Sequence, residues 1–170
     1  MSRGAQYEAA AAGQEQGQGQ QEHARAGAQL EERYAFVGCR PAVVPAICRN
    51  GLLRVGHPLN PSQSTDPGWF GDPKQGVYVA QCSDYCIKYA NGGRPLASGE
   101  SARIVLLKVL PGRVYHCGAV EMGRAPEPGY DSHESPHALE WYLPLEGQCC
   151  PMAVLTVRAD DTRANLADDK

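Results

Sequence analysis

Gly76-Val77-Tyr78-Val79-Ala80, with Tyr89 eleven residues after its tyrosine, is the stretch that decides the fold. Its β-branched and aromatic residues predict a short strand that opens on a glycine, and residues 83–91 predict a helix that carries the second tyrosine. A strand and a helix joined in this way can present two aromatic rings to one flat ligand, such as a nicotinamide or a nucleobase. The alternative is that both tyrosines belong to the core.

The other predicted elements place helices near the start of the foldable region and strands near its end. We predict strands at 34–38, 76–80, 102–110, 113–117, 139–145 and 152–157, helices at 41–49 and 83–91, and long loops at 52–74 and 118–136. ARIVLLKVL at 102–110 is nearly continuous in apolar residues, which is typical of a central strand. This order indicates an α+β domain and not a βαβ repeat with a parallel sheet.

Composition divides the 170 residues into three parts. Residues 1–31 are rich in Gln, Ala and Gly, and such a segment buries too little apolar surface to offset the entropy of ordering it, so we predict that it is disordered. Residues 32–159 are long enough for one core that buries roughly two thirds of the unfolded surface. Residues 160–170 form a charged tail that we expect to fray.

Charge and hydropathy exclude several classes of protein. The formal net charge is −3 and no run of Lys and Arg occurs, so the sequence predicts no direct nucleic-acid footprint. No apolar stretch approaches the ~20 residues of a membrane span, and the N-terminus lacks the hydrophobic region of a signal peptide. We therefore expect a nuclear or cytoplasmic protein that does not associate with membranes.

The seven cysteines fit that compartment, because their odd number and the missing secretory signal argue against a disulfide framework. Cys82-x3-Cys86 and His133-x3-His137 have spacings that a zinc site could use, yet no C-x2-C pair accompanies them. We predict no metal, and interpret the cysteines as buried or casually exposed thiols. Neither a Walker loop nor a G-x-G-x-x-G motif is present.

Two blocks of the sequence resemble the first part of the poly(ADP-ribose) polymerase (PARP) catalytic domain. Val37-Gly38 stands where that family has His-Gly, and Gly51-Leu52 follows at the family's spacing of fourteen residues. Residues 75–80, Gln-Gly-Val-Tyr-Val-Ala, resemble the family's strand Lys-Gly-Ile-Tyr-Phe-Ala, and Tyr89 stands as its second tyrosine.

A third block keeps the spacing of the family's last conserved segment. Gln148 and Pro151 lie eight and eleven residues after Glu140, as in the family's Glu…Gln-x-x-Pro pattern. The three blocks cover residues 34 to 157, so the resemblance implies a PARP-like ADP-ribosyltransferase fold with a mostly antiparallel, split sheet and two short helices. The phrases at 71–78, 82–84 and 148–154 look closest to a degenerate branch, the pseudo-PARP domains of the TASOR proteins.

The resemblance implies a role for each residue of an NAD site. Glu140 would hold the ribose 2′-hydroxyl and orient the acceptor, because a carboxylate stabilises the oxocarbenium-like transition state of nicotinamide release. Tyr78 and Tyr89 would sandwich the nicotinamide, and the Gly38 backbone would pair with its carboxamide. Cys86 stands at the position of a family serine and is a weaker hydrogen-bond partner.

Val37 is the departure from the family pattern, since valine replaces a histidine that hydrogen-bonds the adenosine ribose. Losing that bond costs about 1–3 kcal/mol, or roughly tenfold to a hundredfold in affinity. The resemblance therefore implies a weakened or inactive NAD site that serves as a binding or regulatory module, in TASOR-like proteins one of chromatin silencing, with a protein partner. The alternative is an active mono-ADP-ribosyltransferase that uses NAD as substrate and a protein as acceptor.

Overall fold

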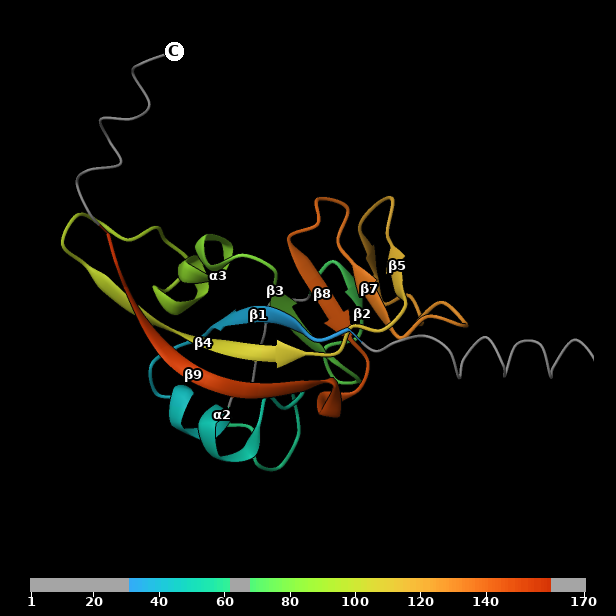
Figure 1. Ribbon diagram of the computed structural model, residues 1–170, viewed down its shortest axis with the longest axis horizontal. Coiled ribbons are helices and arrows are strands. Elements are labelled where there is room, and N and C mark those ends of the chain that lie inside the picture. Colours follow the sequence, from blue (N-terminus) through green and yellow to red (C-terminus); the bar gives the residue numbers. More distant parts are fainter. Residues whose placement is uncertain (1–30, 62–67, 160–170) are drawn as a thin grey trace, which may run out of the picture. The chain divides into compact units, whose positions relative to one another are not determined.

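The computed structural model describes residues 31–61 and 68–159 (Figure 1). Apart from Glu31, the segment predicted to be disordered lies outside the described residues, and so does the predicted charged tail. From Glu31 onward the described residues belong to one compact unit.

The described part of the chain contains two α-helices, nine strands and one 3-10 helix, η1 (Glu146–Gln148). Their bounds are β1 (Arg33–Gly38), α2 (Val44–Asn50), β2 (Phe70–Gly71), β3 (Val77–Ala80), α3 (Ser83–Ala90), β4 (Ser101–Val109), β5 (Val114–His116), β6 (Glu121–Met122), β7 (Ser132–Glu134), β8 (Glu140–Leu143) and β9 (Cys149–Arg158). Every predicted strand and helix is confirmed to within a few residues. The sequence patterns missed β2, β6 and β7. β2 and β6 have two residues each, too few to show a periodicity, and the three residues of β7, Ser-His-Glu, are all polar.

Seven strands form one sheet in the order β5-β7-β8-β3-β1-β4-β9, and β2 and β6 form a separate pair. Within the large sheet only β5 and β7 run parallel to each other, so the mostly antiparallel α+β fold is confirmed. The sheet is nearly split in its middle: β1 and β3 are in register only at Phe36 and Ala80, whereas β1 pairs with β4 along its whole length.

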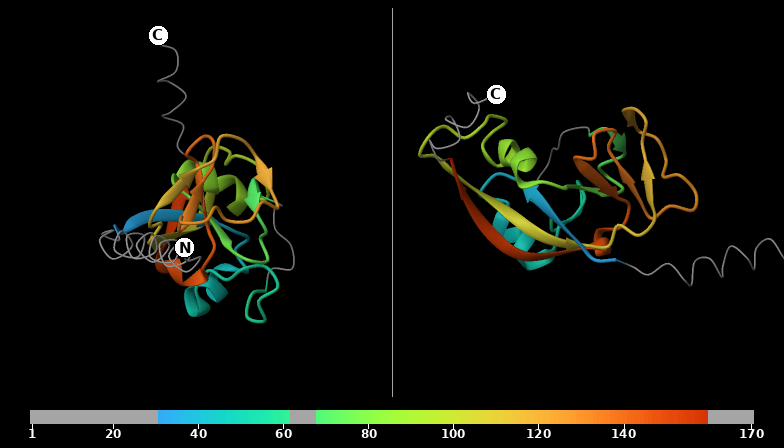
Figure 2. Two further views of the ribbon diagram at one scale, coloured as in Figure 1. Left: turned by 90° about the vertical axis from the view of Figure 1, so that its right-hand side faces the viewer. Right: turned by 45° about the horizontal axis from the view of Figure 1, so that its top comes forward.

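The helices cover opposite faces of the β1–β4–β9 half of the sheet (Figures 1 and 2). Val44 and Ile47 of α2 pack on one face against residues such as Ala35 and Val105. Cys86 of α3 packs on the other face with Ile104, Ala80 and Phe36. Because both faces of β4 are covered, its apolar residues are nearly continuous, as the sequence predicts for a central strand.

A third cluster fills the other half of the sheet. Trp69, Phe70, Cys117 and Tyr142 are buried there, and Tyr78 and Tyr115 pack against them. Trp69 and Phe70 lie in the segment predicted to be a surface loop, and that prediction is wrong at this point because their rings pack onto β3 and β8. In the part of the chain that the structure describes, no helix is both long and apolar enough to cross a membrane.

Candidate functional site

A cavity of about 340 Å³ lies beside the split between β1 and β3. All five residues that the sequence assigned to a site line it: Gly38 from β1, Tyr78 from β3, Cys86 and Tyr89 from α3, and Glu140 from the start of β8. The remaining lining residues are Phe36, Val37, Gly68, Trp69, Ala80, Tyr85 and Val120. The tertiary structure thus brings the five together, while their roles toward NAD stay predictions.

Gly38 lies where strand β1 meets helix α3. A Cβ atom at this position would lie 1.8 Å from the carbonyl oxygen of Cys86, far inside van der Waals contact. Only glycine lets the two backbones approach this closely, so the residue has a packing reason that is independent of any ligand.

Tyr78 is held by the segment that precedes β3. Its hydroxyl donates a hydrogen bond to the carbonyl oxygen of Phe70, and its ring centroid lies 6.5 Å from that of Trp69. Gly68, with φ +76°, approaches the same hydroxyl end so closely that a Cβ there would lie 2.4 Å from the ring. The ring borders the cavity, but its hydroxyl is occupied within the protein.

Tyr89 pairs with Tyr85, a residue that sequence reasoning did not assign to the site. The two rings meet edge to face with centroids 5.8 Å apart, and their hydroxyl oxygens are 3.3 Å apart. The ammonium of Lys88 lies 4.2 Å from the Tyr85 ring centroid and 4.8 Å from that of Tyr89. The four-residue spacing of the tyrosines on a predicted helix, which places both on one face, could have revealed Tyr85.

Glu140 is anchored by its backbone and contacted at its carboxylate. Ser135 Oγ accepts the Glu140 amide at 3.1 Å, and the Ser135 amide donates to the Glu140 carbonyl at 2.9 Å. The Tyr85 hydroxyl donates to the Glu140 carboxylate over 3.2 Å. Burial first, then the hydrogen bond with Tyr89 and the negative charge of Glu140, raise the pKa of Tyr85, so its hydroxyl stays protonated and remains a donor.

Cys86 turns its thiol into its own helix. The side chain is only 2% exposed, and its Sγ donates to the Ser83 carbonyl at 3.2 Å. Burial, and after it the neighbouring Cys82, raise the pKa of the Cys86 thiol to about 12. The other cysteine of the predicted spacing, Cys82, is exposed, and within residues 31–61 and 68–159 no three His, Cys, Asp or Glu side chains gather into a possible metal site.

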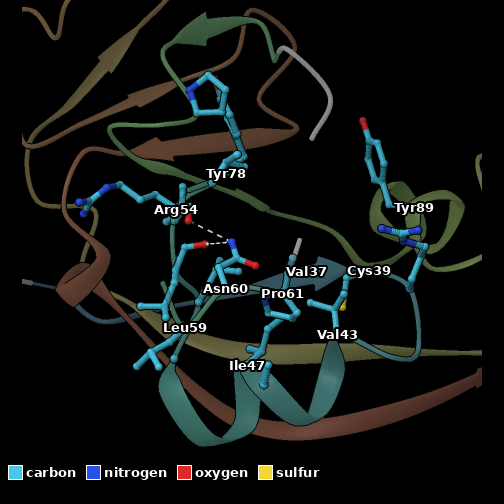
Figure 3. Close-up of a pocket in the computed structure, with 18 of the residues that line it drawn as sticks. Val37, Cys39, Val43, Ile47, Arg54, Leu59, Asn60, Pro61, Tyr78 and Tyr89 are labelled. Atoms are coloured by element: carbon cyan, nitrogen blue, oxygen red, sulfur yellow. Dashed lines mark hydrogen bonds between the residues drawn. The ribbon is translucent and has the colours of Figure 1, made fainter. Parts of the chain in front are cut away.

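A second cavity of about 390 Å³ adjoins the first and shares Val37, Gly38, Tyr78 and Tyr89 with it (Figure 3). Its floor is largely apolar, with Val43, Ile47, Leu59 and Pro61 among the lining residues. In the view of Figure 3, Val37 lies between Tyr78 and Tyr89. A valine at this junction offers no hydrogen bond to either cavity.

The loop after α2 forms one wall of this second cavity. The Asn60 side-chain amide donates to the carbonyls of Leu53 and Arg54, at 2.8 and 3.0 Å, and so closes the loop on itself (Figure 3). The Arg54 guanidinium lies 3.3 Å from the Glu146 carboxylate, which also accepts the Arg54 backbone amide. Arg54 of this wall is therefore already paired with Glu146.

A family model matches residues 20–140 and carries the description "Protein of unknown function (DUF3715)". The chain belongs to the DUF3715 family. Among solved structures, this DUF3715 chain is similar to one titled "Crystal structure of the TASOR pseudo-PARP domain", with 23% sequence identity, a TM-score of 0.57, and coverage of 82% of this chain and 73% of that one. The likeness establishes the PARP-like fold. A comparison with the curated proteins finds no match.

Several polar side chains of the site in this DUF3715 chain are already hydrogen-bonded within the protein. Aromatic side chains surround the cavity, yet the Tyr78 hydroxyl, the Cys86 thiol and the Tyr85 hydroxyl all donate to groups of the protein. Val37 adds neither a donor nor an acceptor. A ligand acceptor that takes one of these three donors would have to displace its partner within the protein.

Proposed function

We propose that this DUF3715 chain is a PARP-fold binding or regulatory module with a weakened or inactive NAD site. The observation that carries the proposal is the hydrogen bond from the Tyr85 hydroxyl to the Glu140 carboxylate. In the catalytic reading that carboxylate must accept the ribose 2′-hydroxyl. In this chain, a ribose hydroxyl would have to displace the Tyr85 hydroxyl from the Glu140 carboxylate, or share the carboxylate with it.

Val37 supports the same conclusion by a separate route. Its side chain lines both cavities at the position where the PARP pattern has its ribose-binding histidine. The missing hydrogen bond reduces NAD affinity roughly tenfold to a hundredfold. Poor positioning lowers the rate further, because catalysis at such a site depends on geometry.

The similarity to the TASOR pseudo-PARP domain supports extending the proposal to the module's setting. We infer a protein partner, a nuclear location and a part in transcriptional silencing. Direct nucleic-acid binding does not belong to this proposal, because the net charge is −3 and the sequence has no basic run.

One observation favours an active mono-ADP-ribosyltransferase as the second candidate. Glu140, Tyr78, Tyr89 and Gly38 line a single cavity, which is the first requirement for the catalytic reading. On this alternative, NAD displaces Tyr85 from the carboxylate, and ADP-ribose passes from NAD to a protein acceptor.

The two candidates differ in what NAD does to the purified chain. We expect no transfer of label from NAD labelled in its ADP-ribose part, and no NAD-dependent rise in melting temperature, for the native chain. Combining Val37→His with Tyr85→Phe returns a ribose partner and releases the Glu140 carboxylate, so NAD should then raise the melting temperature by a few degrees.

Two glutamate variants decide the outcome. Glu140→Gln removes the carboxylate in the cavity, and Glu32→Gln is the control because Glu32 makes an exposed ion pair with Lys108. Labelling of the native chain that is lost in Glu140→Gln and kept in Glu32→Gln would establish the enzyme and overturn the pseudoenzyme proposal.

A further inference from the structure

The cavity beside the sheet split has an unusual lining for a nucleotide site. Five aromatic side chains from four separate segments border it: Phe36, Trp69, Tyr78, Tyr85 and Tyr89. Among the described residues that line it, Glu140 is the one charged residue, and none is Lys or Arg. The lining therefore combines several aromatic rings with a single negative charge.

Such a lining attracts cations. The face of an aromatic ring carries negative potential, and a desolvated cation within about 6 Å of the ring centroid is held by it. A carboxylate in the same partly buried site adds a charge attraction that water screens less than at the surface. An anionic diphosphate gains neither effect in this cavity.

Lys88 shows that two of these rings already hold an ammonium group. Its Nζ atom lies 4.2 Å from the centroid of Tyr85 and 4.8 Å from that of Tyr89. Lys88 does not line the cavity, so its ammonium acts on these rings from outside it. The two rings therefore accept a cation, and Lys88 competes for them with any cation that enters the cavity.

The hydrogen bonds around the cavity decide which kind of cation fits. Among the described side chains that line it, the strong acceptor is the Glu140 carboxylate, which already accepts the Tyr85 hydroxyl. An unmodified lysine ammonium is strongly hydrated and needs acceptors for its three N–H groups. A methylated ammonium spreads its charge over methyl groups that contact aromatic rings and need few or no hydrogen bonds.

We propose that this cavity binds a methylated ammonium group, presented as a trimethyllysine side chain of a partner protein. The cavity volume of about 340 Å³ has room for that group and the end of its methylene chain. The inference rests on the proposed function, because it assigns a ligand to a site that does not turn over NAD. Aromatic rings supply the walls, and Glu140 supplies the counter-charge.

The test uses three versions of one short peptide of glycines and alanines with a single central side chain. The first carries trimethyllysine, the second unmodified lysine, and the third a neutral isostere in which carbon replaces the quaternary nitrogen. Binding to the full chain is followed by the fluorescence of its tryptophans and by calorimetry. We expect the trimethyllysine peptide to bind at least about tenfold more tightly than either of the others.

Variants assign the binding to this cavity. Tyr89→Leu removes a half-buried wall, and Glu140→Gln removes the counter-charge; each should weaken the trimethyllysine peptide about tenfold or more. Tyr34→Leu is the matched control, because Tyr34 is exposed on β1 and does not line the cavity. Lys88→Met removes a competing cation from the same rings, so it should tighten binding several-fold, a gain that misfolding cannot produce.

The outcomes separate this inference from the proposed function. Equal binding of the trimethyllysine peptide and its neutral isostere, or loss of binding in Tyr34→Leu as in Tyr89→Leu, would overturn the methylammonium site. Choline bound more tightly than the peptide would overturn the assignment to a partner protein. NAD labelling that depends on Glu140, measured on the same preparation, would overturn the proposed function itself, whatever the peptides do.

Discussion

Several residues of the site make contacts that stabilise the fold, whether or not a ligand binds. Tyr85 contacts Tyr89 and Glu140, Cys86 contacts its own helix, and Gly38 admits the helix backbone onto the strand. These contacts give the residues a structural role that does not depend on NAD chemistry, because they hold α3 against β1 and β8.

Gly38 gives the sharpest test of that statement. Gly38→Ala places a methyl group 1.8 Å from the Cys86 carbonyl oxygen, so β1 and α3 must separate. Forcing a group into a filled site typically costs about 1–3 kcal/mol, and the contact with a backbone atom puts this change at about 3 kcal/mol or more. Urea unfolding measures the loss.

Gly118→Ala is the control for that change, because no other atom lies within 4 Å of a Cβ at Gly118. Its free energy of unfolding should stay within about 1 kcal/mol of the native value. Equal stability of the two alanine variants would contradict the close contact between β1 and α3.

At the scale of elements, side-chain hydrogen bonds join the two halves of the sheet in addition to strand pairing. Gln148, just before β9, is one such connection. Its Oε1 accepts the Leu145 amide at 2.9 Å, and its Nε2 donates to the carbonyls of Leu110 and Asp131, at 3.2 and 2.9 Å. It therefore joins the start of β9 to the end of β4 and to the segment before β7. The sequence identified Gln148 by its position eight residues after Glu140, and the structure gives that residue a structural role.

Gln148→Ala should destabilise the chain by about 2 kcal/mol, because three hydrogen bonds are lost and each contributes about 0.5–1.5 kcal/mol, less where water replaces the partner. The midpoint of urea unfolding measures the change. Gln75→Ala is the control, since the Gln75 side chain is exposed. A shift no larger than that of the control would remove Gln148 from the connections that hold the sheet halves together.

For the whole molecule, a buried histidine couples stability to pH. His133 is fully buried, stacks on Phe70 with ring centroids 4.1 Å apart, and accepts the Glu127 amide at Nε2 over 2.9 Å. Burial, and then the positive charge of Arg124, lower the pKa of His133. The neutral ring is therefore the form that the fold requires.

Because the pKa of His133 is lower in the folded state, the unfolded chain binds a proton first as the pH falls. The stability that depends on the neutral ring is fully present above the unfolded pKa of about 6.5, and it is lost as the pH falls from there through the lower folded pKa. Urea unfolding at pH 7.5, 6.5 and 5.5 should show this decline, and His133→Phe should flatten it. His137→Phe, at an exposed histidine, should leave the decline unchanged; parallel curves for the two variants would exclude His133 as its source.

Local patterns were sufficient for the long elements and insufficient for the short ones. The apolar run at 102–110 and the β-branched and aromatic residues around Tyr78 predicted β4 and β3, because a buried strand is rich in such residues. β2 and β6 have two residues each, and β7 consists of Ser, His and Glu, so none of the three leaves such a trace. Trp69 and Phe70 were placed in a surface loop because the Gly- and Pro-rich segment around them conceals two buried rings.

By itself the amino-acid sequence determined the α+β class, the order of the main elements and the five residues gathered in the cavity, because spacing along the chain survives without coordinates. Only the tertiary structure decided how those residues are used: that Tyr85 donates to Glu140, that Phe70 holds the Tyr78 hydroxyl, and that none of the described residues lining the cavity is basic. These contacts join segments 8 to 55 residues apart. Their existence depends on how strands and helix pack against one another, and no local pattern records that packing.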